Sequence, residues 1–289
     1  VWYSDTDNYL QLLADEFDDA CSIGIDKNFP AKFLLPLMNL VDECHFELGS
    51  ECVDRVRMIK DEKEQQLMIE ASKINDLVVD EVINICAKGD LTEEEVSKQL
   101  EGIYQKHGCV GNSFEPIVAY GKNGADNHHS GDDSCLKAGD SIVIDIGGLY
   151  KGYCSDMTRT VFYKEVSPKQ KAVYELVLKA QKAAEAMIKP GVRLCDIDKC
   201  ARDIIAEGGY TVEFNHRLGH FIGRDVHEWC DVSQNFDLEV QEGMTFSIEP
   251  GVYLQGEFGV RIEDLVLVTK DGCKVLNSYP KDLRVIGND

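Results

Sequence analysis

The longest pattern of apolar positions in this chain is typical of an amphipathic helix. From Asp61 to Lys88, apolar residues recur at steps of three and four positions, and Gly89 follows as a stop signal. The residues that set this period are Leu67, Ala71, Ile74, Val78, Val82 and Cys86. The sequence therefore predicts one long helix over 61–88 that packs one face against a core.

Capping signals mark three further helices. Thr92 and Glu95 form a capping-box pattern, Ser167 with Pro168 opens a helix, and Gly208 ends another. These helices are expected over 92–107, over 167–188 and directly before 208. Apolar runs between them predict strands at 114–120, 141–149, 153–163, 243–253 and 259–268. Strands that cluster between helices favour an α+β fold, with helices packed on a curved sheet.

Residues 1–55 differ from the rest of the chain. Short apolar stretches there are split by turn residues such as Asn28 and Pro30, and no repeat is present. So few apolar residues provide too little core for an independent domain. We therefore expect an incomplete small domain over 1–55 and one large domain over 56–289.

Acidic residues interrupt two apolar hairpins of the large domain. In the first hairpin, a turn centred on Tyr150 and Lys151 would place Asp145 opposite Asp156. In the second hairpin, a turn at Gly256 would do the same for Glu249 and Glu263. Facing like charges are destabilising in a sheet.

Bound cations would remove the cost of these acidic pairs. Buried unpaired carboxylates would each cost several kcal/mol or would have to protonate. Divalent cations relieve that penalty. His220 lies between glycines that allow close backbone approach, and it supplies the nitrogen ligand expected beside four carboxylates. The sequence therefore predicts a metal centre in the large domain.

Composition narrows the class of protein. Hydrophobic residues make up 44% of the 289 residues, an ordinary globular fraction, and the formal net charge is -22. So strong an acidic excess argues against nucleic acid and anionic membranes as partners. The 11 cysteines are odd in number and include no CxxC pair, which predicts free thiols in a reducing cytoplasm. Neither a signal peptide nor an apolar run long enough for a membrane helix is visible.

The motifs around these acids resemble those of the creatinase and methionine-aminopeptidase superfamily, the "pita-bread" metallopeptidases. The Xaa-Pro peptidase branch, prolidases and aminopeptidase P, is the most similar, and the resemblance runs from about Val53 to the C-terminus. Its motifs are Val143-Ile-Asp-Ile-Gly-Gly, Tyr153-Cys-Ser-Asp-Met-Thr-Arg-Thr, His216-Arg-Leu-Gly-His, Asp225-Val-His-Glu, Phe246-Ser-Ile-Glu-Pro-Gly-Val-Tyr and Gly259-Val-Arg-Ile-Glu-Asp. Residues 1–55 resemble the last part of the family's N-terminal creatinase-like domain.

The resemblance implies a role for each motif residue. Two metal ions, with Mn²⁺ expected first and Co²⁺, Zn²⁺ or Fe²⁺ as alternatives, would be bridged by Asp156 and Glu263. Asp145 would complete one site, and His220 with Glu249 would complete the other. The resemblance also implies catalytic or supporting roles for further residues: Glu249 as proton shuttle, His227 and His128 at the substrate, and Arg261 and His216 at the substrate or behind the ligands.

The resemblance further implies an activity and an assembly. Hydrolysis of the Xaa-Pro bond in dipeptides is the first expectation, and the protein is expected to form a homodimer. Three alternatives stay open, namely an Xaa-Pro aminopeptidase acting on longer peptides, a methionine aminopeptidase and a non-catalytic binding homologue. The chain departs from the family pattern near the substrate, where Asn127 and Trp229 stand at or near positions that are often proline. The motifs therefore predict the metal ligands more firmly than the substrate.

Overall fold

A computed structural model describes residues 2–17 and 21–288 of the chain. It divides the chain into a small unit, Val1–Arg57, and a large unit, Met58–Asp289. The sequence placed this boundary after residue 55. The interpretation of the small unit as part of a creatinase-like domain stays a prediction.

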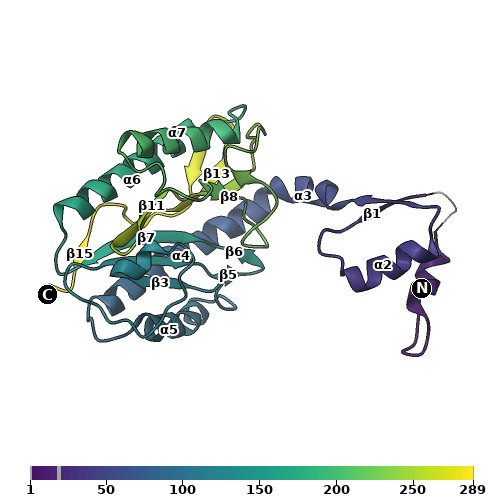
Figure 1. The fold of residues 1–289 in the computed structure, drawn as a ribbon, viewed down its shortest axis with the longest axis horizontal. Coiled ribbons are helices and arrows are strands. Elements are labelled where there is room, and N and C mark those ends of the chain that lie inside the picture. The colour runs from purple at the N-terminus through teal and green to yellow at the C-terminus, as the bar shows by residue number, and fades with distance from the viewer. Residues whose placement is uncertain (1, 18–20, 289) are drawn as a thin grey trace. The chain divides into compact units, whose positions relative to one another are not determined.

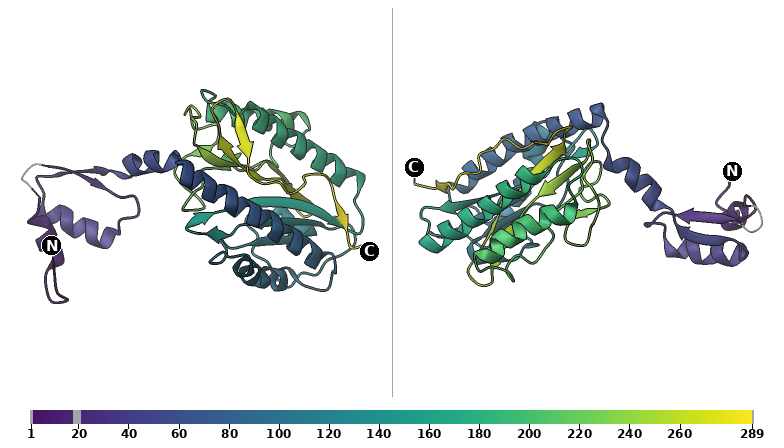
Figure 2. Two further views of the ribbon diagram at one scale, coloured as in Figure 1. Left: turned by 180° about the vertical axis from the view of Figure 1, so that it is seen from behind. Right: turned by 90° about the horizontal axis from the view of Figure 1, so that it is seen from above.

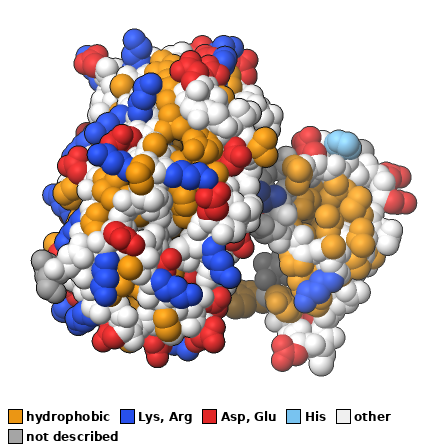
Figure 3. Space-filling model, turned by 60° about the vertical axis from the view of Figure 1, so that its left-hand side comes forward, with side chains coloured by type: hydrophobic (Ala, Val, Ile, Leu, Met, Phe, Trp, Pro, Cys, Tyr) orange, Lys and Arg blue, Asp and Glu red, His pale blue; other side chains and the backbone are white. Residues whose placement is uncertain are grey.

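The small unit is a β-α-β arrangement with little buried surface. Its two strands pair in parallel, and large apolar side chains such as Leu35 and Met38 remain exposed. Figure 3 shows one face of the molecule with apolar and charged side chains on its surface. The elements of this unit are α1 Tyr9–Ala14, β1 Ser22–Ile25, α2 Ala31–Leu40, β2 His45–Leu48 and α3 Ser50–Met58, the last of which reaches the boundary.

Four long helices of the large unit confirm the helical pattern of the sequence. Thr92 forms the expected capping box with Glu95, and Ser167 begins a helix as expected. Ser167 and Asp61 also form capping boxes, with Gln170 and Glu64, that were not predicted. The helices are α4 Glu62–Cys86, α5 Glu93–Lys106, α6 Pro168–Met187 and α7 Leu194–Glu207. None of the helices in the described residues is long and apolar enough to cross a lipid bilayer.

The strands of the large unit are shorter than the predicted ones, because the acidic hairpins are broken near their acids. One sheet has the order β15-β7-β4-β3 and another β10-β13-β14, and the remaining strands form pairs. All pairs in this unit are antiparallel except β15 with β7. The strands are β3 Ile117–Tyr120, β4 Ser141–Ile146, β5 Leu149–Tyr150, β6 Tyr153–Cys154, β7 Met157–Tyr163, β8 Gly219–His220, β9 Asp231–Val232, β10 Thr245–Ile248, β11 Gly251–Leu254, β12 Phe258–Arg261, β13 Asp264–Val268, β14 Cys273–Val275 and β15 Val285–Ile286.

The described residues of the large unit form three hydrophobic clusters, and the two larger cores each pack a pair of helices against strands. In one core, α4 and α5 pack against β3, β4 and β7, and in the other, α6 and α7 pack against β10 to β13. Figure 1 and Figure 2 show these helix pairs beside different parts of the strand layer. Each core thus contains one acidic hairpin, and contacts of β12 with β4 and β7 bring the two hairpins together. This arrangement confirms the expected α+β class, with helices packed on strands.

Candidate metal centre

One cavity of the large unit collects the side chains that the sequence singled out. Its volume is about 320 Å³. Its walls come from both acidic hairpins, from the loop before β4 and from the segment around β8. The candidate residues that line it are His128, Asp145, Asp156, His216, His220, His227, Glu249, Arg261 and Glu263. The structure therefore brings together every candidate residue named from the sequence.

The first acidic hairpin differs from the expectation by two residues. Asp145 pairs with Thr158, so the expectation that it faces Asp156 was wrong. The reason is the turn, where Lys151 and Gly152 both have left-handed backbone, with φ of 49° and 83°. Such a pair suits a two-residue hairpin turn centred one position later than predicted. A shift of two residues keeps the same face of the sheet, so Asp145 and Asp156 remain diagonal neighbours.

The second acidic hairpin has the expected register. β10 pairs with β13, and β11 pairs with β12, in one continuous register about the turn at Gly256. Glu249 and Glu263 lie at the break between these strand pairs, directly across from each other. Pro250 has no N–H to donate to a ladder, which accounts for the break.

Three ligand atoms of this cavity are close enough to share one cation. One atom each from Asp156, His220 and Glu263 lies within 4.8 Å of the others. His220 Nε2 is 3.4 Å from Asp156 Oδ2 and 3.5 Å from Glu249 Oε1. A carboxylate group with one imidazole is a donor set for a divalent transition metal.

The carboxylates of the cavity also leave oxygen atoms without partners. Asp145 Oδ1, Asp156 Oδ1 and Glu263 Oε1 are all buried and accept no hydrogen bond in the described structure. An orphaned buried carboxylate oxygen costs free energy, because it has lost water without gaining a donor. Three such atoms at one cavity fit the binding of divalent cations, and we conclude that the residues present suit a metal centre.

Burial and mutual repulsion act together on these acids. Burial and the charge of Asp145 raise the pKa of Asp156 well above its usual range. Burial and the charge of Asp156 do the same to the pKa of Glu263. Burial raises the pKa of Glu249 to about 7, although His220 opposes this shift. Without cations, the cluster therefore binds protons that a metal would displace.

The histidines of the cavity are held in the neutral form. Burial lowers the pKa of His220, which suits an imidazole that donates a lone pair to a cation. Burial and the neighbouring His220 lower the pKa of His227 to about 4. Their rings meet edge to face with centroids 4.3 Å apart. A neutral His227 can donate an N–H hydrogen bond to a group bound in the cavity.

Arg261 lies behind the carboxylates and orients one of them. Its Nη2 donates to Asp145 Oδ2 at 2.6 Å, its Nη1 donates to the Tyr253 hydroxyl at 2.9 Å, and its Nε donates to Thr158 Oγ1 at 3.0 Å. The side chain is only 3% exposed. His216 contacts the same Tyr253 hydroxyl at 2.9 Å through Nε2. Both residues thus support other side chains of the cavity wall.

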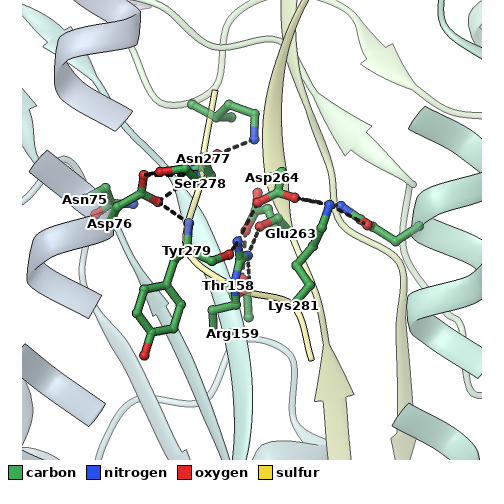
Figure 4. A network of polar contacts seen from close by, with 12 residues as sticks. Asn75, Asp76, Thr158, Arg159, Glu263, Asp264, Asn277, Ser278, Tyr279 and Lys281 are labelled. Atoms are coloured by element: carbon green, nitrogen blue, oxygen red, sulfur yellow. Dashed lines mark hydrogen bonds and ion pairs between the residues drawn. The ribbon is translucent and has the colours of Figure 1, made fainter. Parts of the chain in front are cut away.

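A buried charge network behind Glu263 was not foreseen from the sequence. Arg159 Nη1 donates to the backbone oxygen of Glu263 at 2.6 Å, and its Nη2 donates to Asp264 Oδ1 at 2.7 Å. Lys281 Nζ also contacts Asp264, and Figure 4 shows these groups beside the segment Asn277–Lys281. Arg159 interrupts a strand that is buried at every position, and this interruption was the available sequence signal.

A second group of possible ligands is already satisfied without a cation. Glu93 accepts a hydrogen bond from the backbone N–H of Tyr120 at 2.6 Å and one from the N–H of Asp132 at 3.1 Å. His129 Nε2 lies 2.6 Å from Glu93 Oε2. We interpret this group as an anchor for the loop that presents His128 to the cavity. The preference for His128 over His129 as the active-site residue is consistent with this anchor, but no contact tests it.

The chain is similar to known metallopeptidases over most of its length. Residues 66–270 match the model of metallopeptidase family M24. A putative dipeptidase, YkvY, of Bacillus subtilis is 45% identical over 83% of this chain and 66% of its own length. An Xaa-Pro dipeptidase of Pyrococcus horikoshii is 39% identical over 93% of this chain and 78% of its own length. The chain thus spans about two thirds to four fifths of these relatives.

A solved structure is similar over the same region. Recombinant prolidase from Thermococcus sibiricus superimposes with a TM-score of 0.93 at 35% identity, over 99% of this chain and 79% of that chain. At this level of identity the likeness extends to the family as well as to the fold.

Proposed function

Because the chain belongs to metallopeptidase family M24, we propose that it hydrolyses the bond before proline in dipeptides at a centre of two divalent metal ions. The observation that carries this proposal is the convergence of five candidate ligands, with three orphaned carboxylate oxygens among them, on one cavity. The relatives named as dipeptidases support the choice of substrate.

In this proposal the ligands divide between two metal ions. Asp156 and Glu263 would hold both ions, Asp145 would be a further ligand of one ion, and His220 and Glu249 would be further ligands of the other. The closeness of Asp156, His220 and Glu263 supports this division. An oxygen-rich donor set with one imidazole suits Mn²⁺ first, then Co²⁺, Zn²⁺ or Fe²⁺. Elemental analysis of protein purified without added metal would test the identity of the ions.

Protein side chains would move and stabilise the charges of the reaction. Bound divalent ions would supply an acidified water and polarise the scissile carbonyl. Glu249 would act as the general base and would return the proton to the leaving nitrogen. Ser247 donates to Glu249 Oε1 at 3.2 Å, which leaves Oε2 for the proton. The neutral imidazole of His227 would donate a hydrogen bond as negative charge grows on the carbonyl oxygen, and His128 would hold the substrate.

The bond before proline sets particular demands on a site. Its nitrogen is a tertiary amide without hydrogen, so the site needs no acceptor there. It needs instead an apolar surface for the pyrrolidine ring and a proton for the leaving nitrogen. Phe114, Ile117 and Val226 give the cavity apolar wall, and Glu249 is the proton donor.

The alternatives are separated by a small panel of peptides. With Mn²⁺ present, we expect turnover of Ala-Pro to exceed that of Ala-Pro-Ala and of Met-Ala-Ser. Preference for Ala-Pro-Ala would move the assignment to an Xaa-Pro aminopeptidase. Cleavage of Met-Ala-Ser alone would indicate a methionine aminopeptidase. Cleavage of none of them would favour a binding homologue, although all five ligand positions are kept at the cavity.

Substitution of His227 should separate catalysis from metal binding. The variant His227→Ala is expected to lose turnover by about 10²–10³-fold, the scale of removing one oxyanion donor. The variant should keep its metal, because His227 is not a proposed ligand. It only packs against the ring of His220. The measurements are kcat and metal content, with His107→Ala as a control outside the cavity. Loss of metal from His227→Ala would show that His227 is itself a ligand.

Two further proposals concern the assembly and compartment of the protein. The family resemblance leads us to propose a homodimer, and light scattering from a monomer at micromolar concentration would refute it. We also propose a reducing compartment, the cytoplasm, because the 11 cysteines are odd in number and include no CxxC pair. Localisation of a tagged full-length protein would test this assignment.

A further inference from the structure

Two arginines line the cavity in the described part of the chain, and their guanidinium groups differ in the contacts that they already make. Arg261 donates to Asp145, Tyr253 and Thr158 from its three nitrogens and is almost completely buried. Its charge is already paired with Asp145. Arg217 lines the same cavity, and 35% of its side chain is exposed.

The guanidinium of Arg217 has one ion-pair contact with the described residues, and this contact is made at its Nε atom. Its Nε lies 3.1 Å from Asp231 Oδ1, but this contact lacks hydrogen-bond geometry and leaves the Nε–H without an acceptor. The structure records no hydrogen bond from the two terminal nitrogens of Arg217 to any residue that it describes. The terminal fork is therefore available to a planar anion, which arginine binds through two parallel hydrogen bonds.

The second candidate for anion recognition, His216, is committed elsewhere. Its Nδ1 lies 2.6 Å from the backbone oxygen of Arg217, and its Nε2 lies 2.9 Å from the Tyr253 hydroxyl. Burial lowers the pKa of His216 to about 3, so the ring carries no positive charge at neutral pH. His216 can therefore shape the cavity wall, but it offers no charge to an anion.

The position of Arg217 suits the carboxylate of a dipeptide. In an Xaa-Pro dipeptide, a single carbon atom separates the leaving nitrogen from the carboxylate carbon. A cation that binds this carboxylate must therefore lie in the same cavity as the groups that act on the scissile bond. Arg217 precedes His220 by three residues and lines the same cavity as His220 and His227.

We propose that Arg217 binds the free carboxylate of the dipeptide and thereby selects dipeptides over longer substrates. This inference rests on the proposed function. Asp231 lies beside the Nε of Arg217, and the Arg217 side chain lines the cavity. A longer peptide places a neutral amide where the carboxylate would lie, so it gains no ion pair from Arg217.

The test compares Ala-Pro with its C-terminal amide in the Mn²⁺-loaded protein. The wild-type protein should prefer the free carboxylate by on the order of 10- to 100-fold in kcat/KM, the scale of one charge-assisted hydrogen bond. In the variant Arg217→Gln, kcat/KM for Ala-Pro should fall by the same factor, mainly through a higher KM. Its kcat/KM for the amide should change by less than about threefold. Arg217→Lys keeps the charge without the fork and should fall between the two.

A control variant and a measurement of metal content separate a loss of carboxylate binding from a general loss of activity. Arg193→Gln also breaks ion pairs, to Asp196 and Asp237, but lies outside the cavity and should change neither substrate. The metal content of Arg217→Gln should equal that of the wild type. Equal losses with both substrates, or no loss with either, would overturn the role of Arg217, as would a wild type indifferent to the carboxylate. If the wild type cleaves neither substrate, the proposed function fails and this inference fails with it.

Discussion

Dialysis against a chelator is expected to abolish peptide hydrolysis, and Mn²⁺ is expected to restore it. The expectation follows from the buried acids of the cavity, where Asp145, Asp156 and Glu263 each leave one oxygen without a donor. No hydrogen-bond donor in the described residues reaches these three oxygen atoms. Turnover of Ala-Pro, measured before and after chelation with metal content followed in parallel, checks the result. Unchanged turnover in fully metal-free protein would contradict the whole functional assignment.

Metal removal should also change stability in a pH-dependent way. The folded-state pKa of Glu249, about 7, is above its ordinary value of 4.5. A raised carboxyl pKa contributes stability that is complete below the unfolded value and is lost as pH rises through the folded value. The metal-free protein should therefore lose stability between about pH 4.5 and pH 7. Burial raises the pKa values of Asp156 and Glu263 in the same direction.

Mn²⁺ should stabilise the protein more at high pH, because it no longer competes with protons for the ligands. At a free Mn²⁺ concentration about 100 times Kd, binding should add about 2.7 kcal/mol to the free energy of unfolding. Thermal denaturation with and without Mn²⁺, at about pH 6 and about pH 8, measures the difference. The variant Asp156→Asn should lose most of this effect. An equal increase in Tm with Mn²⁺ at both pH values would contradict the expectation that the metal-free carboxylates bind protons.

The variant Glu249→Gln is expected to lose turnover by about 10²–10⁴-fold or more, the contribution of general acid–base catalysis. Glutamine keeps the size of the side chain but removes a negative charge from the proposed ligand set and a site for the shuttled proton. The loss should fall on kcat, since the leaving nitrogen receives its proton from this group. Single-turnover hydrolysis of Ala-Pro, with metal content measured on the same sample, checks it.

The same hairpin offers a matched control for Glu249. Glu257 is an exposed glutamate near the turn and pairs with Lys169, so Glu257→Gln makes the same chemical change outside the cavity. It should leave turnover and metal content unchanged. If Glu249→Gln retains wild-type turnover with bound metal, another group must carry the proton.

Local signals in the sequence were enough to place the helices and the second acidic hairpin. The capping boxes at Thr92 and Ser167 begin helices as expected, because each satisfies backbone N–H groups within a few residues. The register of Glu249 and Glu263 followed from the turn at Gly256, which has φ of 79°. Interactions of this short range can be read from adjacent residues.

The first hairpin shows where such reading fails. Its turn depends on Lys151, a residue without a strong preference for the left-handed backbone that it adopts. Composition alone therefore could not choose between two centres one position apart. The pairing of Arg159 with Asp264 was missed for a different reason. These residues are far apart in the chain, and only the packing of the two hairpins brings their charges together.

The continuous register about Gly256 limits which changes in chain length this region can accept during evolution. Glu249 and Glu263 face each other because the residues between them divide evenly about the turn. Inserting or deleting one residue on either arm would turn every later side chain of that arm to the opposite face. We therefore expect homologous chains to vary freely in the composition of this turn but to keep its length, and to place their insertions elsewhere.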